Sequence, residues 1–155
     1  MTTLTPEQNA VLNAEIANDP QGKGYAALLP DRPGHVVDLL NAETEFIHKR
    51  RIMTVLKLMD DLGVTMYESV MNKLDAIAPA RVIVRDFLAR FRADSADVGS
   101  PTTLEMIDVV GAIAAPNGFT AEEVTKLKSL SLQPASHAEV LGLPYITEKM
   151  LRERQ

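Results

Sequence analysis

Apolar residues recur along this chain at the spacing of an α-helix and do not alternate as they would in a half-buried strand. The first segment illustrates the pattern. Pro6 suits the first position of a helix, and Val11, Leu12 and Ile16 follow on one face. We therefore predict a first helix over about 6–18.

The same periodicity predicts further helices, many of them short. A helical turn is expected in GYAALL, and a short helix should run from Pro33 to near Asn41. Longer helices are expected in RIMTVLKLMDDLG, TMYESVMNKLDAIA, ARVIVRDFLARF, TTLEMIDVVGAIAAP and TAEEVTKLKSLSL, and two short ones at Ser136–Leu141 and Thr147–Glu153. The predicted fold class is all-α: a compact bundle of about eight short to medium helices with no extended sheet.

Capping boxes support these helix starts. In a capping box, a serine or threonine is followed three residues later by glutamate or glutamine, and each side chain satisfies the other residue's backbone N–H. The pattern predicts helix starts at Thr5/Gln8, Thr65/Glu68, Thr102/Glu105, Thr120/Glu123 and Ser136/Glu139.

Two stretches interrupt the helical pattern. AETEFIHKRR, residues 42–51, has no clear periodicity and is interpreted as a strand or an extended arm. RADSADVGSP is polar and rich in turn formers, which predicts a mobile loop. Because half of a 155-residue chain buries too little surface alone, we predict one helical domain over 1–155 with a flexible waist at 93–101.

Acidic residues outnumber basic ones by 21 to 16, so the formal net charge is −5. This balance opposes non-specific binding to nucleic acid and to anionic membranes, because both require a basic face. The chain has no cysteine, which excludes disulfides, thiolate chemistry and cysteine-ligated zinc. It also lacks a leader-like start and the ~18 consecutive apolar residues of a membrane span, so we expect a soluble, unprocessed protein.

Motifs for catalysis or cofactor binding are missing from the sequence. The histidines His35, His48 and His137 are far apart, and none belongs to a metal-binding pattern such as H-E-x-x-H. Neither G-x-S-x-G nor S-x-x-K occurs. The glycines around Lys23 do not form a phosphate-binding loop, because a helix precedes them where a buried strand is required. We expect no enzymatic activity, no cofactor and no metal.

Two basic segments are candidates for binding a partner. The run HKRR comprises His48, Lys49, Arg50 and Arg51 and precedes an amphipathic helix; it is a solvated face or a contact for an acidic partner or nucleic acid. The last predicted helix carries Lys149 and Arg152. With the preceding helix it resembles a helix-turn-helix in outline over 136–155, so a small DNA-binding regulator is the alternative function. Glutamates on that last helix argue against phosphate contacts.

Two motifs resemble a family of small tailed-bacteriophage proteins. The first is NDPQGKGYAALL…VVDLLNA within 18–42, similar to the family pattern D-P-x-G-x-G-Y-A followed by a leucine–asparagine step. The second is LSLQPASHAEVLGLPYIT within 130–147, similar to R-P-x-S-R-A-E-x-L-G. The match covers about a third of the chain. Gln133 and His137 stand where the family pattern commonly has arginines.

The residues of both motifs also have a direct physical interpretation. Gly22, Gly24 and Tyr25 should form a corner after the first helix. Pro134 and Ser136 should end one element and cap the next. We therefore expect the two motifs to pack against each other and to encode backbone shape more than a binding site.

The resemblance implies a function. Genes of this family are commonly carried among virion structural and morphogenesis genes, which implies a protein made in the bacterial host cytoplasm and located in the virion. Its partners would be other virion proteins, in a symmetric multi-copy assembly of capsid, neck or tail. The expectation is a non-enzymatic structural or morphogenesis protein that acts through protein–protein contacts.

Overall fold

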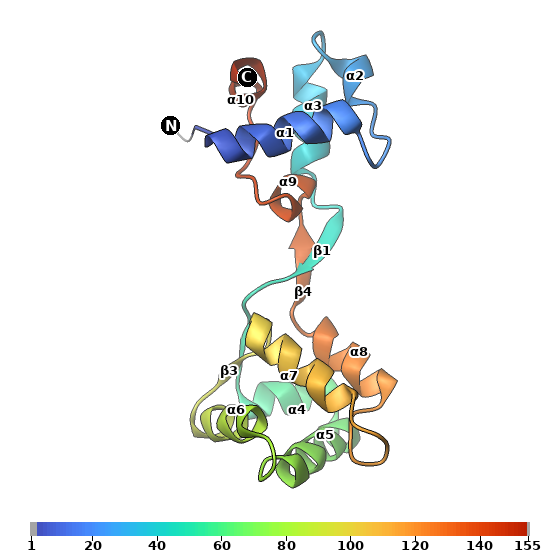
Figure 1. The fold of residues 1–155 in the computed structure, drawn as a ribbon, viewed down its shortest axis with the longest axis vertical. Coiled ribbons are helices and arrows are strands. Elements are labelled where there is room, and N and C mark those ends of the chain that lie inside the picture. Colours follow the sequence, from blue (N-terminus) through green and yellow to red (C-terminus); the bar gives the residue numbers. More distant parts are fainter. Residues whose placement is uncertain (1–2, 155) are drawn as a thin grey trace. The chain divides into compact units, whose positions relative to one another are not determined.

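The computed structural model describes residues 3–154 (Figure 1). The chain divides into two compact units. Unit 1 combines the segment up to Ile47 with the segment from Pro134 onward, and unit 2 is His48–Gln133. Each unit has its own apolar core.

Unit 1 contains five of the helices of the described chain: α1 (Pro6–Asn18), α2 (Tyr25–Leu28), α3 (Pro33–Asn41), α9 (His137–Val140) and α10 (Glu148–Glu153). Its core brings the first and last parts of the chain together. The fully buried side chains include Leu12 of α1, Tyr25 of α2, Val36 and Leu40 of α3, and Ile146. The expectation that the two motifs pack against each other is confirmed.

Unit 2 contains α4 (Val55–Leu62), α5 (Val64–Ile77), α6 (Val82–Ala93), α7 (Pro101–Gly111) and α8 (Ala121–Ser129). Its buried core includes Met53, Val70, Val84, Phe91 and Val110. The stacked rings of Phe87 and Phe91, with centroids 5.6 Å apart, add an aromatic pair on α6.

The described residues also form two small pairs of strands. β1 (Glu45–His48) pairs with β4 (Leu132–Ala135), and β2 (Ile52–Met53) pairs antiparallel with β3 (Ala96–Asp97). The fold is thus dominated by helices, as predicted, whereas a fold built of helices alone is not observed. The strand interpretation of residues 42–51 is confirmed for β1. Strands of two to four residues are too short to show an alternating pattern in the sequence.

Most helix starts follow the local chemistry. Thr5 and Thr120 form complete capping boxes with Gln8 and Glu123, and Ser136 accepts a hydrogen bond from the Glu139 N–H. The starts predicted at Thr65 and Thr102 are wrong, because both residues lie inside helices. Pro101 occupies the first turn of α7 and Ser100 caps it, whereas α5 begins directly after Gly63, which has a positive φ of 80°.

The segment 93–101 lies within unit 2, whereas the division between the units falls at 47/48 and 133/134. Ala96 and Val98 are buried, and the Val98 N–H donates to the carbonyl oxygen of Arg51. The carboxylate of Asp97 accepts the N–H groups of Arg51 and Gly99. These contacts attach the segment expected to be a flexible waist to the basic run His48–Arg51.

Candidate interaction surfaces

The first motif forms a corner around Asp19. This residue follows α1 with a left-handed backbone (φ 41°), and its carboxylate oxygens accept the N–H groups of Lys23 and Gly24 at 2.7 and 2.8 Å. Gly24 also has a positive φ, 82°, which glycine tolerates without strain. The corner directs Tyr25 into the core of unit 1, where its side chain is fully buried.

A buried polar cluster joins the two motifs inside unit 1. Glu15 Oε1 accepts the hydroxyl of Tyr25 at 3.0 Å and lies 2.7 Å from Nε2 of His137. The other ring nitrogen of His137, Nδ1, lies 2.9 Å from Oε2 of Glu45. We call Glu15, Tyr25, Glu45 and His137 the carboxylate–imidazole cluster. It links α1, α2, β1 and α9.

The cluster changes the acidity of its members. Burial raises the pKa of the Tyr25 hydroxyl, and the neighbouring Glu15 carboxylate raises it further. The hydrogen bond from His137 lowers the pKa of Glu45 below the ordinary range, with a smaller contribution from Gln21. No pattern in the sequence predicts this cluster. The available signal was Glu15 itself, which lies between Leu12 and Ile16 on the buried face of α1.

Asn41, the asparagine of the first motif, holds the second motif in place. Its side-chain Nδ2 donates to the carbonyl oxygen of Ile146 at 2.7 Å, and its Oδ1 accepts the Ile146 N–H at 2.9 Å. One amide side chain therefore satisfies both backbone groups of a core residue that no regular element pairs. The first motif and the part of the second from Pro134 onward thus pack in unit 1, whereas Leu130 of the second motif belongs to the core of unit 2.

We expect Asn41→Ala to destabilise unit 1 by about 2–4 kcal/mol, because both backbone groups of the buried Ile146 lose their partner. Denaturant unfolding monitored by circular dichroism measures the effect. Asn72→Ala is the matched control, since Asn72 is exposed on α5, and it should change stability by less than about 0.5 kcal/mol. Equal midpoints for the two variants would contradict the assigned role of Asn41.

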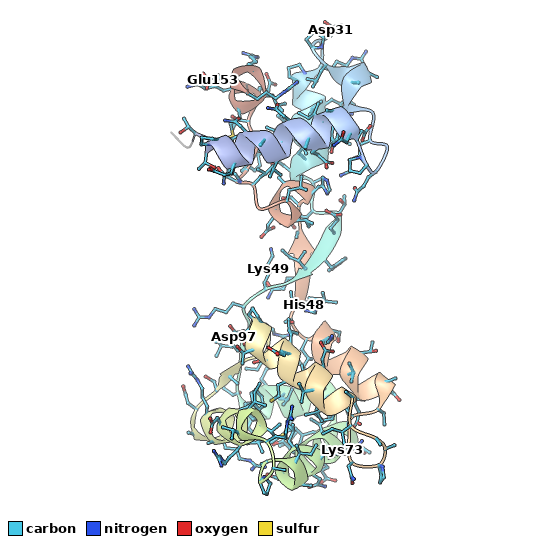
Figure 2. The ribbon with its side chains drawn as sticks, in the orientation of Figure 1. Asp31, His48, Lys49, Lys73, Asp97 and Glu153 are labelled. Atoms are coloured by element: carbon cyan, nitrogen blue, oxygen red, sulfur yellow. The ribbon has the colours of Figure 1, made fainter. Side chains whose placement is uncertain are left out.

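The four residues of the basic run in unit 2 differ in their contacts; Figure 2 labels His48 and Lys49 among them. Nδ1 of His48 lies 2.9 Å from the Ser131 hydroxyl, and the Lys49 N–H donates to the Ser131 carbonyl. Arg51 donates to the carbonyl oxygen of Leu130 and to Asp61. Arg50 is different: its side chain is 80% exposed, and its Nε is 3.8 Å from Asp97.

Arg50 lies at a cleft of about 610 Å³ in unit 2, formed by α6, β2, β3 and the start of α7. The cleft combines apolar and charged groups, and its lining includes Arg50, Ile52, Phe87, Arg90, Asp94 and Asp97. The basic run and the segment 93–101, which the sequence analysis treated separately, therefore both contribute to one cleft. The sequence does not indicate the apolar side chains of this cleft, because they lie on separate elements. The one available signal was Ile52, which directly follows the basic run.

The two cations of the last helix lie in unit 1, apart from the basic run. Arg152 pairs with Glu148 at 2.9 Å, and Lys149 lies 3.7 Å from Glu153, each one turn apart on α10. Lys149 also lines a groove of about 590 Å³ with Leu4, Tyr145 and Met150. These pairs partly neutralise the helix face that the helix-turn-helix alternative would turn toward phosphates.

Several large apolar side chains are exposed in each unit. In unit 1, Phe46 is 66% and Tyr145 71% exposed. In unit 2 the exposed set includes Ile52, Leu56, Val64 and Val82. Single exposed apolar residues are ordinary on protein surfaces. Ile52, however, lines the cleft of unit 2, and Tyr145 lines the groove beside Lys149.

In the described part of the chain, no group of three or more His, Asp or Glu side chains is placed to hold a metal ion. None of the helices within residues 3–154 has the length and apolar character needed to cross a bilayer. No family model, curated protein or solved structure matches the chain.

Proposed function

We propose that this chain is a bacteriophage virion structural or morphogenesis protein that works through protein–protein contacts rather than catalysis. The family-like motifs at both ends support this proposal, and in unit 1 they pack into one core. Partners would be other virion proteins, with the chain present in many copies of a capsid, neck or tail assembly.

The observation that carries the proposal is the cleft of unit 2. Its lining offers apolar surface from Ile52 and Phe87 beside the exposed cation of Arg50 and the carboxylate of Asp94. Protein interfaces combine apolar groups with a polar rim in this way, and arginine is enriched in them. The pairing of β2 with β3 and the hydrogen bonds of Asp97 tie together backbone segments that line the cleft.

The test is mass spectrometry of purified particles from the phage or induced lysogen that carries the gene. We expect the chain at stoichiometric copy number in the particles, or in assembly intermediates if it is a morphogenesis factor. The same particles are then prepared with Arg50→Glu. This substitution inverts an exposed charge at the cleft and should reduce incorporation about tenfold or more, because arginine is enriched among the interface residues whose loss costs about 2 kcal/mol or more.

Arg85→Glu is the matched control, because Arg85 is an exposed arginine on α6 that is absent from the cleft lining. It should leave incorporation unchanged. Absence of the chain from both particles and assembly intermediates would overturn the virion proposal. Equal incorporation of the two variants would remove the cleft as the contact. Duplex DNA binding that weakens steeply with salt and is lost on Lys149→Ala and Arg152→Ala would support the regulator instead.

A further inference from the structure

The imidazole of His137 lies between two carboxylates inside unit 1. Its side chain is 5% exposed, and its two nitrogens face Glu15 at 2.7 Å and Glu45 at 2.9 Å. A carboxylate accepts hydrogen bonds and does not donate them, so each nitrogen that faces one must carry a hydrogen. Only the protonated ring carries a hydrogen on both nitrogens. The observed geometry therefore fits an imidazolium held by two carboxylates.

The surrounding groups strengthen this assignment. From α1 the only buried ionisable side chain is Glu15, which also accepts the hydroxyl of Tyr25 from α2. From β1, Glu45 additionally accepts Nε2 of Gln21 at 3.3 Å. Two charged residues in the corner after α1 also act on the cluster: the negative Asp19 raises the pKa of Tyr25, and the positive Lys23 lowers the pKa of Glu45. The buried side chains of α3, which packs against α9, are all apolar: Val36, Val37 and Leu40. The positive ring thus offsets one of the two negative charges that the neighbouring carboxylates carry.

Loss of the ring proton would affect the two carboxylates unequally. A neutral imidazole keeps one N–H, so one carboxylate must then face a lone pair. The Glu15 side chain is only 4% exposed and cannot exchange its partner for water, whereas the Glu45 side chain is 28% exposed. The remaining proton therefore belongs on Nε2, toward Glu15, and Glu45 turns to solvent.

We propose that His137 is a pH-sensitive latch in unit 1: the protonated ring ties α9 to the start of β1, and its deprotonation releases Glu45 while the contact between α9 and α1 persists. The latch holds below the pH at which the ring loses its proton and opens as pH rises. On the acid side, Glu45 stays ionised to lower pH than an ordinary glutamate, because its pKa is lowered. This inference does not depend on the proposed function.

The test is a pH titration of the full chain by nuclear magnetic resonance, carried upward from the acid side to the highest pH at which the chain stays folded. Ring-nitrogen shifts should change from the doubly protonated form to the Nε2–H tautomer. The side-chain carboxyl carbon of Glu45 should shift with the same midpoint. Amide protection at Ile47 in β1, which lies two residues before the paired Lys49 N–H, should fall about tenfold in the same step once corrected for intrinsic exchange at each pH.

Three variants separate the latch from other titrations. Glu45→Gln keeps an oxygen acceptor without the charge and should remove the coupled step at Ile47. Glu43→Gln is the matched control, because Glu43 is exposed and lies two residues away, and it should leave the step unchanged. His137→Arg supplies a permanent charge and should keep β1 protected throughout the range.

The wild-type spectra alone can overturn the proposal. A ring that is neutral throughout the range in which the chain is folded, an Nδ1–H tautomer at high pH, or a Glu45 carbon that does not follow the ring would each contradict it. The proposal would also be contradicted if Glu45→Gln kept the pH-dependent change in amide protection, because that change would then not depend on the Glu45 carboxylate.

Discussion

Replacing Gly99 by alanine is expected to destabilise unit 2 by about 3 kcal/mol or more. A Cβ at this position would overlap the backbone carbonyl oxygen of Lys49 and would also contact Ser131 Cβ at 3.0 Å. The carbonyl cannot simply move away, because the Lys49 N–H is bonded to the Ser131 carbonyl oxygen. The basic run, segment 93–101 and the start of β4 would have to shift together.

Denaturant unfolding of the full chain measures this loss. Gly34→Ala is the matched control, since a Cβ there would meet only Oε1 of Glu148, the end of a flexible side chain, at 3.0 Å. It should change stability by less than about 1 kcal/mol. If Gly99→Ala unfolds at the same denaturant concentration as the wild type, the close approach of Lys49 to Gly99 is wrong.

Lys73→Met is expected to cost about 3–5 kcal/mol, because it leaves a buried carboxylate without its counter-ion. Glu123 on α8 is 4% exposed and accepts the Lys73 ammonium, the Ser69 hydroxyl at 2.7 Å and the Thr120 N–H at 2.8 Å. Burial alone would raise the pKa of Glu123. The hydrogen bonds from Lys73, Thr120 and Ser69 outweigh it, so the pKa lies below the ordinary value.

A lowered pKa fixes the sign of the pH dependence. The stability from the ionised Glu123 is present above the unfolded-state pKa of about 4.3 and is lost as pH falls through the lower folded value. The free energy of unfolding of the wild type should therefore exceed that of Lys73→Met by a smaller amount at about pH 3 than at about pH 5. Unfolding of both proteins across this range measures the difference, and a constant difference would argue against an ionised pair.

Two further variants test the pairing itself. In Lys73→Met/Glu123→Gln the buried charge is gone, so the double variant should be more stable than the sum of the single changes predicts. Arg92→Met is the surface control. Arg92 and Asp75 form a bidentate pair, but both side chains are half exposed, and its loss should cost less than about 1 kcal/mol.

Much of the secondary structure was predictable, because its causes are local. The helix predicted at 6–18 is α1, since Thr5, Pro6 and Gln8 supply the cap and the first turn from neighbouring positions. The helix predicted from Pro33 to near Asn41 is α3. The errors at Thr65 and Thr102 have a local cause too: a stronger start signal, Ser100 with Pro101 or the turn at Gly63, lies one or two residues earlier.

The candidate sites were less predictable from sequence. The run HKRR was identified, but only the structure shows that Arg51 is bonded to Leu130 and Asp61 whereas Arg50 is exposed. The partners lie about 80 and 10 positions away, and side-chain exposure depends on them. The cleft beside Arg50 could not be inferred, because its walls come from separate elements.

Most of the helices, three of their caps and the corner residues of both motifs follow from the amino-acid sequence, because they depend on interactions within a few positions. The division into two units, the clamp of Asn41 on Ile146 and the meeting of Glu15, Glu45 and His137 depend instead on the tertiary packing. Glu15 and His137 are 122 positions apart, and no local pattern specifies which distant charge a buried ring will meet. That choice depends on how the cores pack, because a buried charge is tolerated only where its partner is also placed.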